Sequence, residues 1–314
     1  MPAALPAPAP STHHDRTGFS MPSITGGKRA IFVFIGPALL IYALIMLVPV
    51  LVSTGYTFFT GSIITGFTFS GFDNYVELFN DSKVGDALLF TLRYAIVLTV
   101  GQVLVGYGLA LIYVFWLRRA SGLIRALVFF PIVLPTVAVS LMFQKLFEVA
   151  PQNGPVNELL NFFGAGSVDW FGSSGSAFFV IILMDIWRSM GFYAVLLYAG
   201  LLDIPEEVLE SARLDGAGGW TLIRRIILPL SLPVLLSTII FSINGTLKVF
   251  DSIVALTNGG PGYSTTPLTL QMFRTAFSYG DYGYGSTIAL LLTAICLLVT
   301  VFIFRSSRRD LTKG

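Results

Sequence analysis

The sequence predicts an all-α membrane protein with six transmembrane helices, and two observations carry that prediction. The 314 residues are 54% hydrophobic and only 11% charged, with a mean hydropathy of +0.79, whereas soluble domains are roughly 45–50% apolar. Six apolar runs also reach the ~20 residues that cross a bilayer as a helix. They are Ile31–Thr54, Tyr94–Phe115, Ile124–Phe147, Ala177–Gly200, Leu230–Ala255 and Ser286–Phe304.

The segments that flank this six-helix domain, residues 31–304, differ from it in composition. Residues 1–30 are rich in proline, serine and glycine and bury too little apolar surface to fold, so a disordered cytoplasmic arm is expected. Its two adjacent histidines lack further ligands, and no metal site is expected. Residues 305–314 are expected to form a basic tail. Within the third run, Pro131 and Pro135 are expected to be tolerated, because neighbouring helices satisfy the carbonyls that a proline frees.

Basic residues set the expected orientation in the membrane. Thirteen lie in the two termini and in alternate connecting segments, against three in the other loops, which are Lys83, Arg93 and Arg274. Lysine and arginine accumulate on the cytoplasmic side of membrane proteins. We therefore expect a multi-pass protein of the cell membrane with both termini in the cytoplasm. The segment between the fourth and fifth runs is expected on the same side.

That segment, which we call the elbow (residues 201–229), carries many charges for this chain. Pro205 suits the first position of a helix, and the carboxylates that follow it suit the positive N-terminal end. Three glycines then predict a tight turn, with little room for a Cβ at Gly216. A second short helix is expected to begin at Trp220 and to stop at Pro229, which cannot continue the hydrogen-bond ladder without a kink.

The elbow resembles the EAA loop of ABC-importer permeases. In that family the loop forms a coupling helix that docks on a cytoplasmic ATPase, so the resemblance implies a type I ABC-importer transmembrane domain. Ser211 stands where the family usually has alanine. The matching residues, expected to couple to the ATPase, are Glu210, Ser211, Ala212, Asp215, Gly216, Ala217, Ile226, Leu228 and Pro229.

A second stretch, from Leu256 to Thr265, resembles a loop of the carbohydrate branch of these permeases, the relatives of the maltose and glycerol-3-phosphate permeases. The resemblance implies that this loop faces a sugar-binding protein. The residues expected there are Asn258, Gly259, Gly260, Pro261 and Gly262.

The resemblance also implies the partners and the cargo. The chain is expected to form half of a heterodimeric pore, with a second related permease, two copies of an ABC ATPase that hold ATP and Mg²⁺, and an extracellular or periplasmic sugar-binding protein. No G-x-x-x-x-G-K-[ST] phosphate loop occurs, so no catalytic residue and no cofactor are expected in this chain. The net charge of +2 gives no reason to expect nucleic acid. The expected cargo is a di- or oligosaccharide.

Polar side chains inside the fourth and fifth runs are the candidates for a solute pathway, because polar groups are costly in a membrane and usually functional there. An aromatic wall beside them is expected from Trp187, Phe192, Phe241 and Phe250. The expected pathway residues are Asp185, Trp187, Arg188, Gly191, Asn244, Gly245, Thr246 and Lys248.

Several alternatives stay open at this point. Asp185 and Arg188, three residues apart on one helix face, form a purely structural ion pair in one of them. The amine of Lys248 reaches the outer interface in another. A homodimer, a glycerol-3-phosphate or polyol importer, an ion-driven secondary transporter and a non-transporting scaffold are the alternative functions.

Overall fold

The computed structural model describes residues 28–117, 121–149 and 151–311. The expected disordered arm, residues 1–30, lies outside the described residues except for its last three, which begin the first helix. The histidine pair of that arm also lies outside them. The chain divides into two compact units, residues 1–52 and 53–314, and each is described by itself.

The first unit is helical throughout its described part. It contains α1 (Lys28–Tyr42), the π-helical segment η1 (Ala43–Leu47) and the start of α2 (Val48–Tyr56). Together they form the first predicted span, an apolar helix of 24 residues from Val33 to Tyr56.

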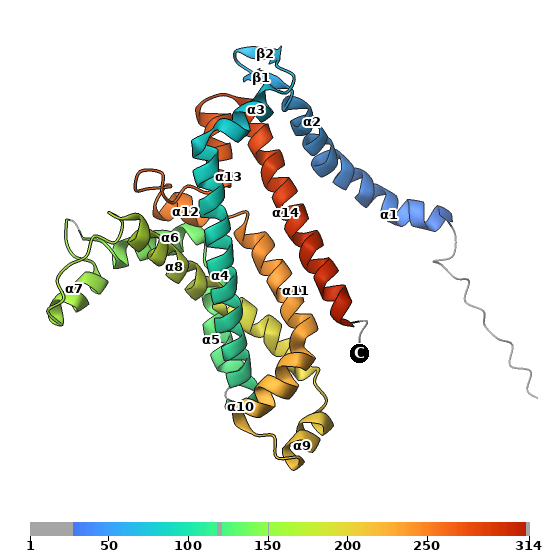
Figure 1. Ribbon diagram of the computed structural model, residues 1–314, viewed down its shortest axis with the longest axis vertical. Helices are drawn as coiled ribbons and strands as arrows, with labels where there is room; N and C mark the ends of the chain where they lie inside the picture. Colours follow the sequence, from blue (N-terminus) through green and yellow to red (C-terminus); the bar gives the residue numbers. More distant parts are fainter. Residues whose placement is uncertain (1–27, 118–120, 150, 312–314) are drawn as a thin grey trace, which may run out of the picture. The chain divides into compact units, whose positions relative to one another are not determined.

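The second unit consists of helices and one short hairpin (Figure 1). Its elements are β1 (Phe59–Ser62), β2 (Gly66–Phe69), α3 (Asp73–Asn80), α4 (Ser82–Phe115), α5 (Ser121–Val133), α6 (Thr136–Leu146), α7 (Pro155–Phe162), α8 (Ser174–Leu202), α9 (Glu206–Leu214), α10 (Gly219–Leu222), the π-helical η2 (Ile223–Ile227), α11 (Leu228–Thr246), α12 (Asp251–Leu256), α13 (Leu268–Phe273), the π-helical η3 (Arg274–Ser278) and α14 (Tyr282–Leu311).

The number of spans agrees with the prediction. Within the described residues, 5 helices are long and apolar enough to cross a membrane, and one bent pair makes a sixth. Helix α4 begins at Ser82 rather than Tyr94, because the Asp81 carboxylate accepts a hydrogen bond of 2.8 Å from the Lys83 backbone and caps the helix. Helix α14 extends to Leu311 and so includes most of the expected basic tail.

The third predicted span, Ile124–Phe147, is wrong as a single straight helix. Helices α5 and α6 meet at an angle of 95°. Pro135 lacks the N–H that would continue the ladder, and its ring disfavours helical geometry at Leu134. The chain therefore turns at this point, instead of continuing as a helix as it does at Pro131 inside α5.

The fifth predicted span, Leu230–Ala255, is displaced, and the predicted stop at Pro229 is wrong. One helix runs from Gly219 to Thr246, through Pro229, and ends nine residues before the predicted end. The segment η2 explains the passage: the Leu228 N–H bonds the Ile223 carbonyl in the wider π pattern. This widening lets the ladder continue where a proline supplies no N–H.

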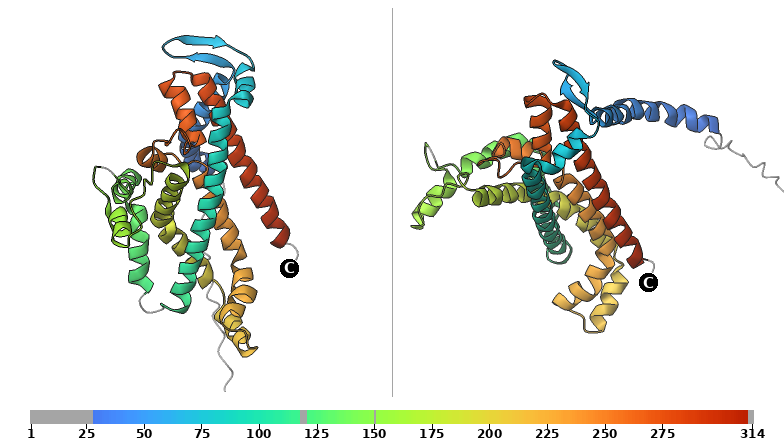
Figure 2. Two further views of the ribbon diagram at one scale, coloured as in Figure 1. Left: turned by 60° about the vertical axis from the view of Figure 1, so that its left-hand side comes forward. Right: turned by 45° about the horizontal axis from the view of Figure 1, so that its top comes forward.

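Helices α4 and α8 contact each other most extensively and form the centre of the second unit. Their backbones approach closely at Gly106, where an added Cβ would lie 2.8 Å from the Tyr193 Cβ. Helix α11 packs against α4 on one side and α14 on the other (Figure 2). The elbow helices α9 and α10 lie at one end of this bundle, and the hairpin and α3 lie at the opposite end (Figure 1).

The hairpin was not among the predicted elements. Strands β1 and β2 pair antiparallel, with Phe59 opposite Phe69 and their rings 5.5 Å apart. The buried Asn74 of α3 donates to the carbonyls of Thr57 and Phe59, at 2.8 and 2.9 Å. These bonds attach the hairpin to the end of the bundle.

Candidate functional site

A cavity of about 370 Å³, which we call the central cavity, lies among α4, α8, α11 and the segment that follows α11. Ile132 and Thr136, which flank the bend between α5 and α6, also line it, so the broken third span contributes to its wall. Three of the four predicted aromatic side chains are on its surface, namely Phe192, Phe241 and Phe250. The cavity therefore combines an apolar wall with polar groups.

The carboxylate of Asp185 is the most buried charged group of this cavity. The Tyr94 hydroxyl donates to its Oδ2 at 2.7 Å, and the Arg188 Nε lies 3.7 Å from its Oδ1. Arg188 keeps 26% of its side chain exposed, whereas Asp185 keeps 4%. The buried Arg188 Nε has no hydrogen-bond acceptor within the described residues. The predicted intrahelical pair is thus present, and the part of the Arg188 side chain that stays exposed lies at the cavity.

A second group of polar side chains joins the three central helices. The Gln102 amide donates from Nε2 to the Ser189 Oγ at 2.8 Å and accepts at Oε1 from the Ser242 Oγ at 2.6 Å. The Ser242 Oγ also lies 3.1 Å from the Thr99 Oγ1, which is 3.4 Å from the Thr246 Oγ1. Because every one of these side chains is buried, the network fixes how α4, α8 and α11 lie against one another.

The structure brings five of the eight predicted pathway residues to the central cavity. They are Asp185, Arg188, Gly245, Thr246 and Lys248. The other three lie elsewhere. Trp187 packs on Phe143, with the ring centroids 5.6 Å apart, and an added Cβ at Gly191 would overlap the Val128 carbonyl of α5.

Asn244, the third of these, lies between two helices. Its Nδ2 donates to the Ile240 carbonyl at 2.9 Å and to the Thr300 Oγ1 of α14 at 3.0 Å. The Thr300 hydroxyl in turn lies 3.2 Å from the Asn244 Oδ1. This geometry joins α11 to α14 rather than to a solute.

Asn244→Ala and Thr300→Val are each expected to lower the thermal unfolding midpoint of the purified protein. The double variant should lose less than the sum of the two, with a coupling of about 0.6 kcal/mol, the usual size for such bonds in membrane proteins. Thermal unfolding of the four proteins in one detergent measures this coupling. Strictly additive losses would contradict the contact.

Sequence reasoning missed Tyr94, Gln102, Ser189 and Ser252, all of which line the central cavity. Gln102 and Tyr94 carried a usable signal, because each is a polar residue within the second apolar run. They were not predicted, because the candidate pathway residues were taken only from the fourth and fifth runs. Ser189 and Ser252 carried little signal, since an isolated serine commonly bonds the carbonyl of its own helix.

The elbow ends its first helix, α9, in a Schellman motif. The Ala217 N–H bonds the Ala212 carbonyl at 2.8 Å and the Gly216 N–H bonds the Arg213 carbonyl at 3.0 Å. Gly216 has a φ of +84°, which disfavours other residues. The predicted lack of room for a Cβ at Gly216 is wrong, because no atom lies within 4 Å of that position. The requirement for glycine is conformational.

The predicted coupling residues occupy two environments. Ala212 is buried, and Ala217 and Ile226 are half-buried against the core at this end. The remaining members of the motif are exposed, namely Glu210, Ser211, Asp215, Gly216, Leu228 and Pro229. Two large apolar side chains beside them are also exposed, Leu214 by 89% and Trp220 by 72%.

Positive φ angles and side-chain hydrogen bonds define the backbone conformation of the loop from Asn258 to Gly262. Asn258, Gly259 and Gly262 have φ values of 46°, 79° and 53°. The Arg274 Nη2 donates to the Asn258 carbonyl at 2.7 Å, and the Thr266 Oγ1 to the Gly259 carbonyl at 3.2 Å. The remaining members, Gly260 and Pro261, line a small cavity with Gln144.

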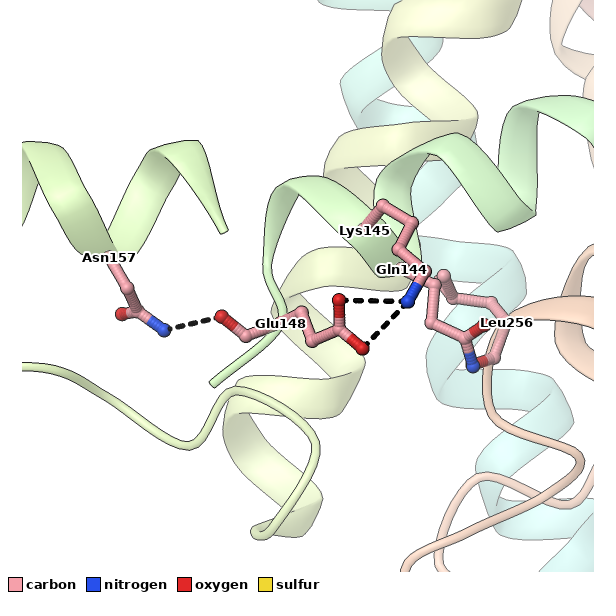
Figure 3. A network of polar contacts seen from close by, with 5 residues as sticks. All are labelled: Gln144, Lys145, Glu148, Asn157 and Leu256. Carbon is pink, nitrogen blue, oxygen red and sulfur yellow. Dashed lines mark hydrogen bonds and ion pairs between the residues drawn. The ribbon is translucent and has the colours of Figure 1, made fainter. Parts of the chain in front are cut away.

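Neighbouring loops at this end are also tied by side chains (Figure 3). Lys145 donates to both oxygens of Glu148, at 2.8 and 2.9 Å, and the Asn157 amide donates to the Glu148 carbonyl at 3.0 Å. The Gln144 Nε2 lies 3.3 Å from the Leu256 carbonyl. These contacts link α6, α7 and the C-terminal end of α12.

Helices long and apolar enough to cross a membrane surround a polar cavity, an architecture that membrane permeases share. Residues 102–311 match the family described as "binding-protein-dependent transport system inner membrane component". The chain belongs to this family. The predicted resemblance to ABC-importer permeases is thereby confirmed.

Relatives with at least 30% identity match between 76% and 90% of the chain. The sulfoquinovosyl glycerol transport system permease SmoG of Agrobacterium fabrum is 33% identical over 90% of this chain and 92% of its own length. The trehalose/maltose transport system permease MalF of Thermococcus litoralis is 33% identical over 76% and 80%. The lactose transport system permease LacF of Rhizobium radiobacter is 30% identical over 88% and 93%.

A solved structure confirms the predicted fold class. A bacterial ABC transporter for the import of the acidic polysaccharide alginate superposes with a TM-score of 0.78 at 20% identity. The superposition covers 89% of this chain and 95% of that one. The same type of transporter, solved with a periplasmic protein that holds an alginate pentasaccharide, gives a TM-score of 0.79.

Proposed function

We propose that this chain forms half of the translocation pathway of an ATP-driven importer for a di- or oligosaccharide. The central cavity is the observation that carries the proposal. Carbohydrates need several hydrogen-bonding side chains beside an apolar wall, and ligand sites generally combine a few placed polar groups with aromatic surface. The carbohydrate names of the relatives support the same cargo class.

In this proposal, Arg188 and Lys248 donate to sugar hydroxyls, and Thr246 is able to donate or accept. Phe192 and Phe241, whose rings lie 5.4 Å apart, face the apolar side of a sugar ring. Asp185 acts through Arg188, because its own Oδ2 is already bonded to Tyr94.

The elbow is proposed to couple this pathway to ATP hydrolysis. Its exposed Leu214 and Trp220 favour a protein partner, since large apolar side chains exposed together mark interaction sites. The proposed assembly contains a second related permease and two copies of a cytoplasmic ATPase that holds ATP and Mg²⁺. A sugar-binding protein outside the membrane completes it and docks near residues 258–262.

The orientation required is the predicted one, with both termini and the elbow in the cytoplasm. Single cysteines replacing Ser82, Asp169 and Tyr279, in a Cys296→Ala background, are expected to react with an impermeant thiol reagent added to intact cells. A cysteine at Gly218 should not react. All four positions are exposed on the protein. Whether each cysteine reacts therefore depends on the side of the membrane on which it lies. Reaction at Gly218 in intact cells would reverse the orientation.

Reconstitution tests the transport function. The complex is placed in proteoliposomes with ATP enclosed and the binding protein outside, and uptake of radiolabelled di- and oligosaccharides is followed. Uptake is expected to require ATP and to stop with vanadate. Uptake that resists vanadate and collapses with an ionophore would establish an ion-driven transporter instead. Uptake of glycerol-3-phosphate or a polyol, without sugar uptake, would change the cargo.

A further inference from the structure

A second cavity, of about 500 Å³, lies at the end of the bundle opposite the elbow. Its lining residues belong to α3, the first turn of α4, the segment from α13 through η3 and the start of α14. Figure 1 shows α3 and the start of α14 at that end of the bundle. Three carboxylates line it, Glu77, Asp81 and Asp281, against one basic side chain, Lys83. We call it the acidic cavity.

Two of the carboxylates have structural partners. Asp81 caps α4 and accepts a hydrogen bond of 2.9 Å from the Tyr284 hydroxyl. Asp281 accepts from the Tyr284 N–H at 3.0 Å, at the start of α14. Both bonds fix the position of the charge, and neither neutralises it.

Glu77 is different, because its carboxylate has no hydrogen bond or ion pair within the described residues. Burial, followed by the charges of Asp281 and Asp81, raises the pKa of Glu77. The ionised form of this group is therefore disfavoured in the isolated chain. Glu77 is exposed, so both water and a positively charged partner can reach its carboxylate.

Two buried polar side chains on the same cavity also lack partners. Gln271 is 5% exposed and Thr275 is 4% exposed, and both line the acidic cavity. Neither side chain makes a hydrogen bond to any part of the chain that the structure describes. Neither contributes a fully buried polar atom without a partner, so the amide and the hydroxyl are reached by the water of the cavity. These two groups, like Glu77, face the cavity and can bond a partner from outside the chain.

The chemistry of the lining selects the kind of partner. A positively charged group forms ion pairs with the carboxylates. The Gln271 amide oxygen and the Thr275 hydroxyl accept hydrogen bonds from further N–H groups. A compact metal ion fits poorly, because no three His, Cys, Asp or Glu side chains of the described residues lie close enough to hold one. A guanidinium spreads five N–H donors over a plane and bonds several separated acceptors at once.

We propose that the acidic cavity receives one basic side chain, an arginine or a lysine, of the sugar-binding protein, and so fixes the register in which that protein docks. The inference rests on the proposed function, since it places this end of the bundle outside the membrane. It adds a docking site distinct from the loop at residues 258–262.

The test uses the complete complex in nanodiscs and measures how its ATPase activity rises with the concentration of binding protein. The double variant Glu77→Gln, Asp281→Asn removes two charges, and asparagine keeps the cap of α14. It is expected to raise the concentration for half-maximal stimulation about tenfold, as for the loss of a charge-assisted bond. Asp86→Asn, which removes an exposed charge of α4 outside the cavity, is the matched control and should change it little.

A small probe isolates the charge itself. Argininamide is expected to compete with the binding protein in the same assay, whereas citrullinamide, which has the same shape without the charge, should not. The double variant should lose this competition. An unchanged half-saturation in the double variant would overturn the proposal, as would competition by calcium chloride instead of argininamide.

Failure of the proposed transport function and failure of the docking role of the acidic cavity give different experimental results. If the binding protein stimulates neither the wild-type complex nor the variants, the proposed function is wrong. Argininamide then still tests the cavity by raising the thermal unfolding midpoint of the wild-type chain more than that of the double variant; equal shifts would overturn the cavity's role as well.

Discussion

Replacing Asp185 with alanine is expected to cost roughly 3 kcal/mol of stability, the usual effect of removing one partner from a buried ion pair. The substitution leaves the Arg188 guanidinium and the Tyr94 hydroxyl without their shared acceptor. Thermal unfolding of the purified protein measures the loss. Sugar uptake should fall with it, because Arg188 is no longer held at the cavity.

Two further variants separate charge from packing. Asp185→Asn keeps an acceptor for Tyr94 and should lie between wild type and alanine. Adding Arg188→Met to Asp185→Ala removes the uncompensated charge and should recover part of the stability. If Asp185→Ala alone unfolds like the wild type, water in the cavity solvates Arg188 well enough, and the ion pair is not structural.

Replacing Gly216 with valine is expected to disrupt the elbow without unfolding the membrane part. A non-glycine residue in the left-handed region costs roughly 1–2 kcal/mol, which corresponds to about a tenfold smaller population of the native turn. Binding-protein-stimulated ATPase activity and sugar uptake should both fall by about that factor. The yield and the thermal unfolding midpoint of the complex should change little, since Gly216 is exposed.

Neighbouring positions provide the controls. Gly218 has a φ of −130° and open space around it, so Gly218→Ala should behave as wild type. Gly216→Asn should be affected much less than valine, because asparagine tolerates the left-handed conformation. Equal loss in all three variants would show that the elbow needs small side chains rather than a particular backbone conformation.

The number of spans was predictable because it depends on the length of apolar runs. The ends of the spans were less predictable, because they depend on local hydrogen bonds. The Asp81 cap of α4 and the continuation of the helix through Pro229 are two examples. The bend at Pro135 was indicated by the sequence, but a proline that kinks a helix and one that ends it look alike. In the structure, α6 packs against α12 after the bend.

The candidate site was predicted in part for a similar reason. Intramembrane charge identified Asp185 and Arg188, and both line the central cavity. The direction in which a neutral side chain points depends on the rotation of its helix, which one sequence does not supply. Asn244 was therefore assigned to the pathway although it contacts α14, and Gln102 was passed over although it joins three helices.

The uninterrupted helix from Gly219 to Thr246 has a mechanical consequence. At 28 residues and 1.5 Å per residue, it is a lever arm about 42 Å long. One end of this lever belongs to the elbow, and the other carries Thr246 on the wall of the central cavity. A tilt of only about 5° at the elbow displaces the far end by about 4 Å, roughly the width of a sugar ring.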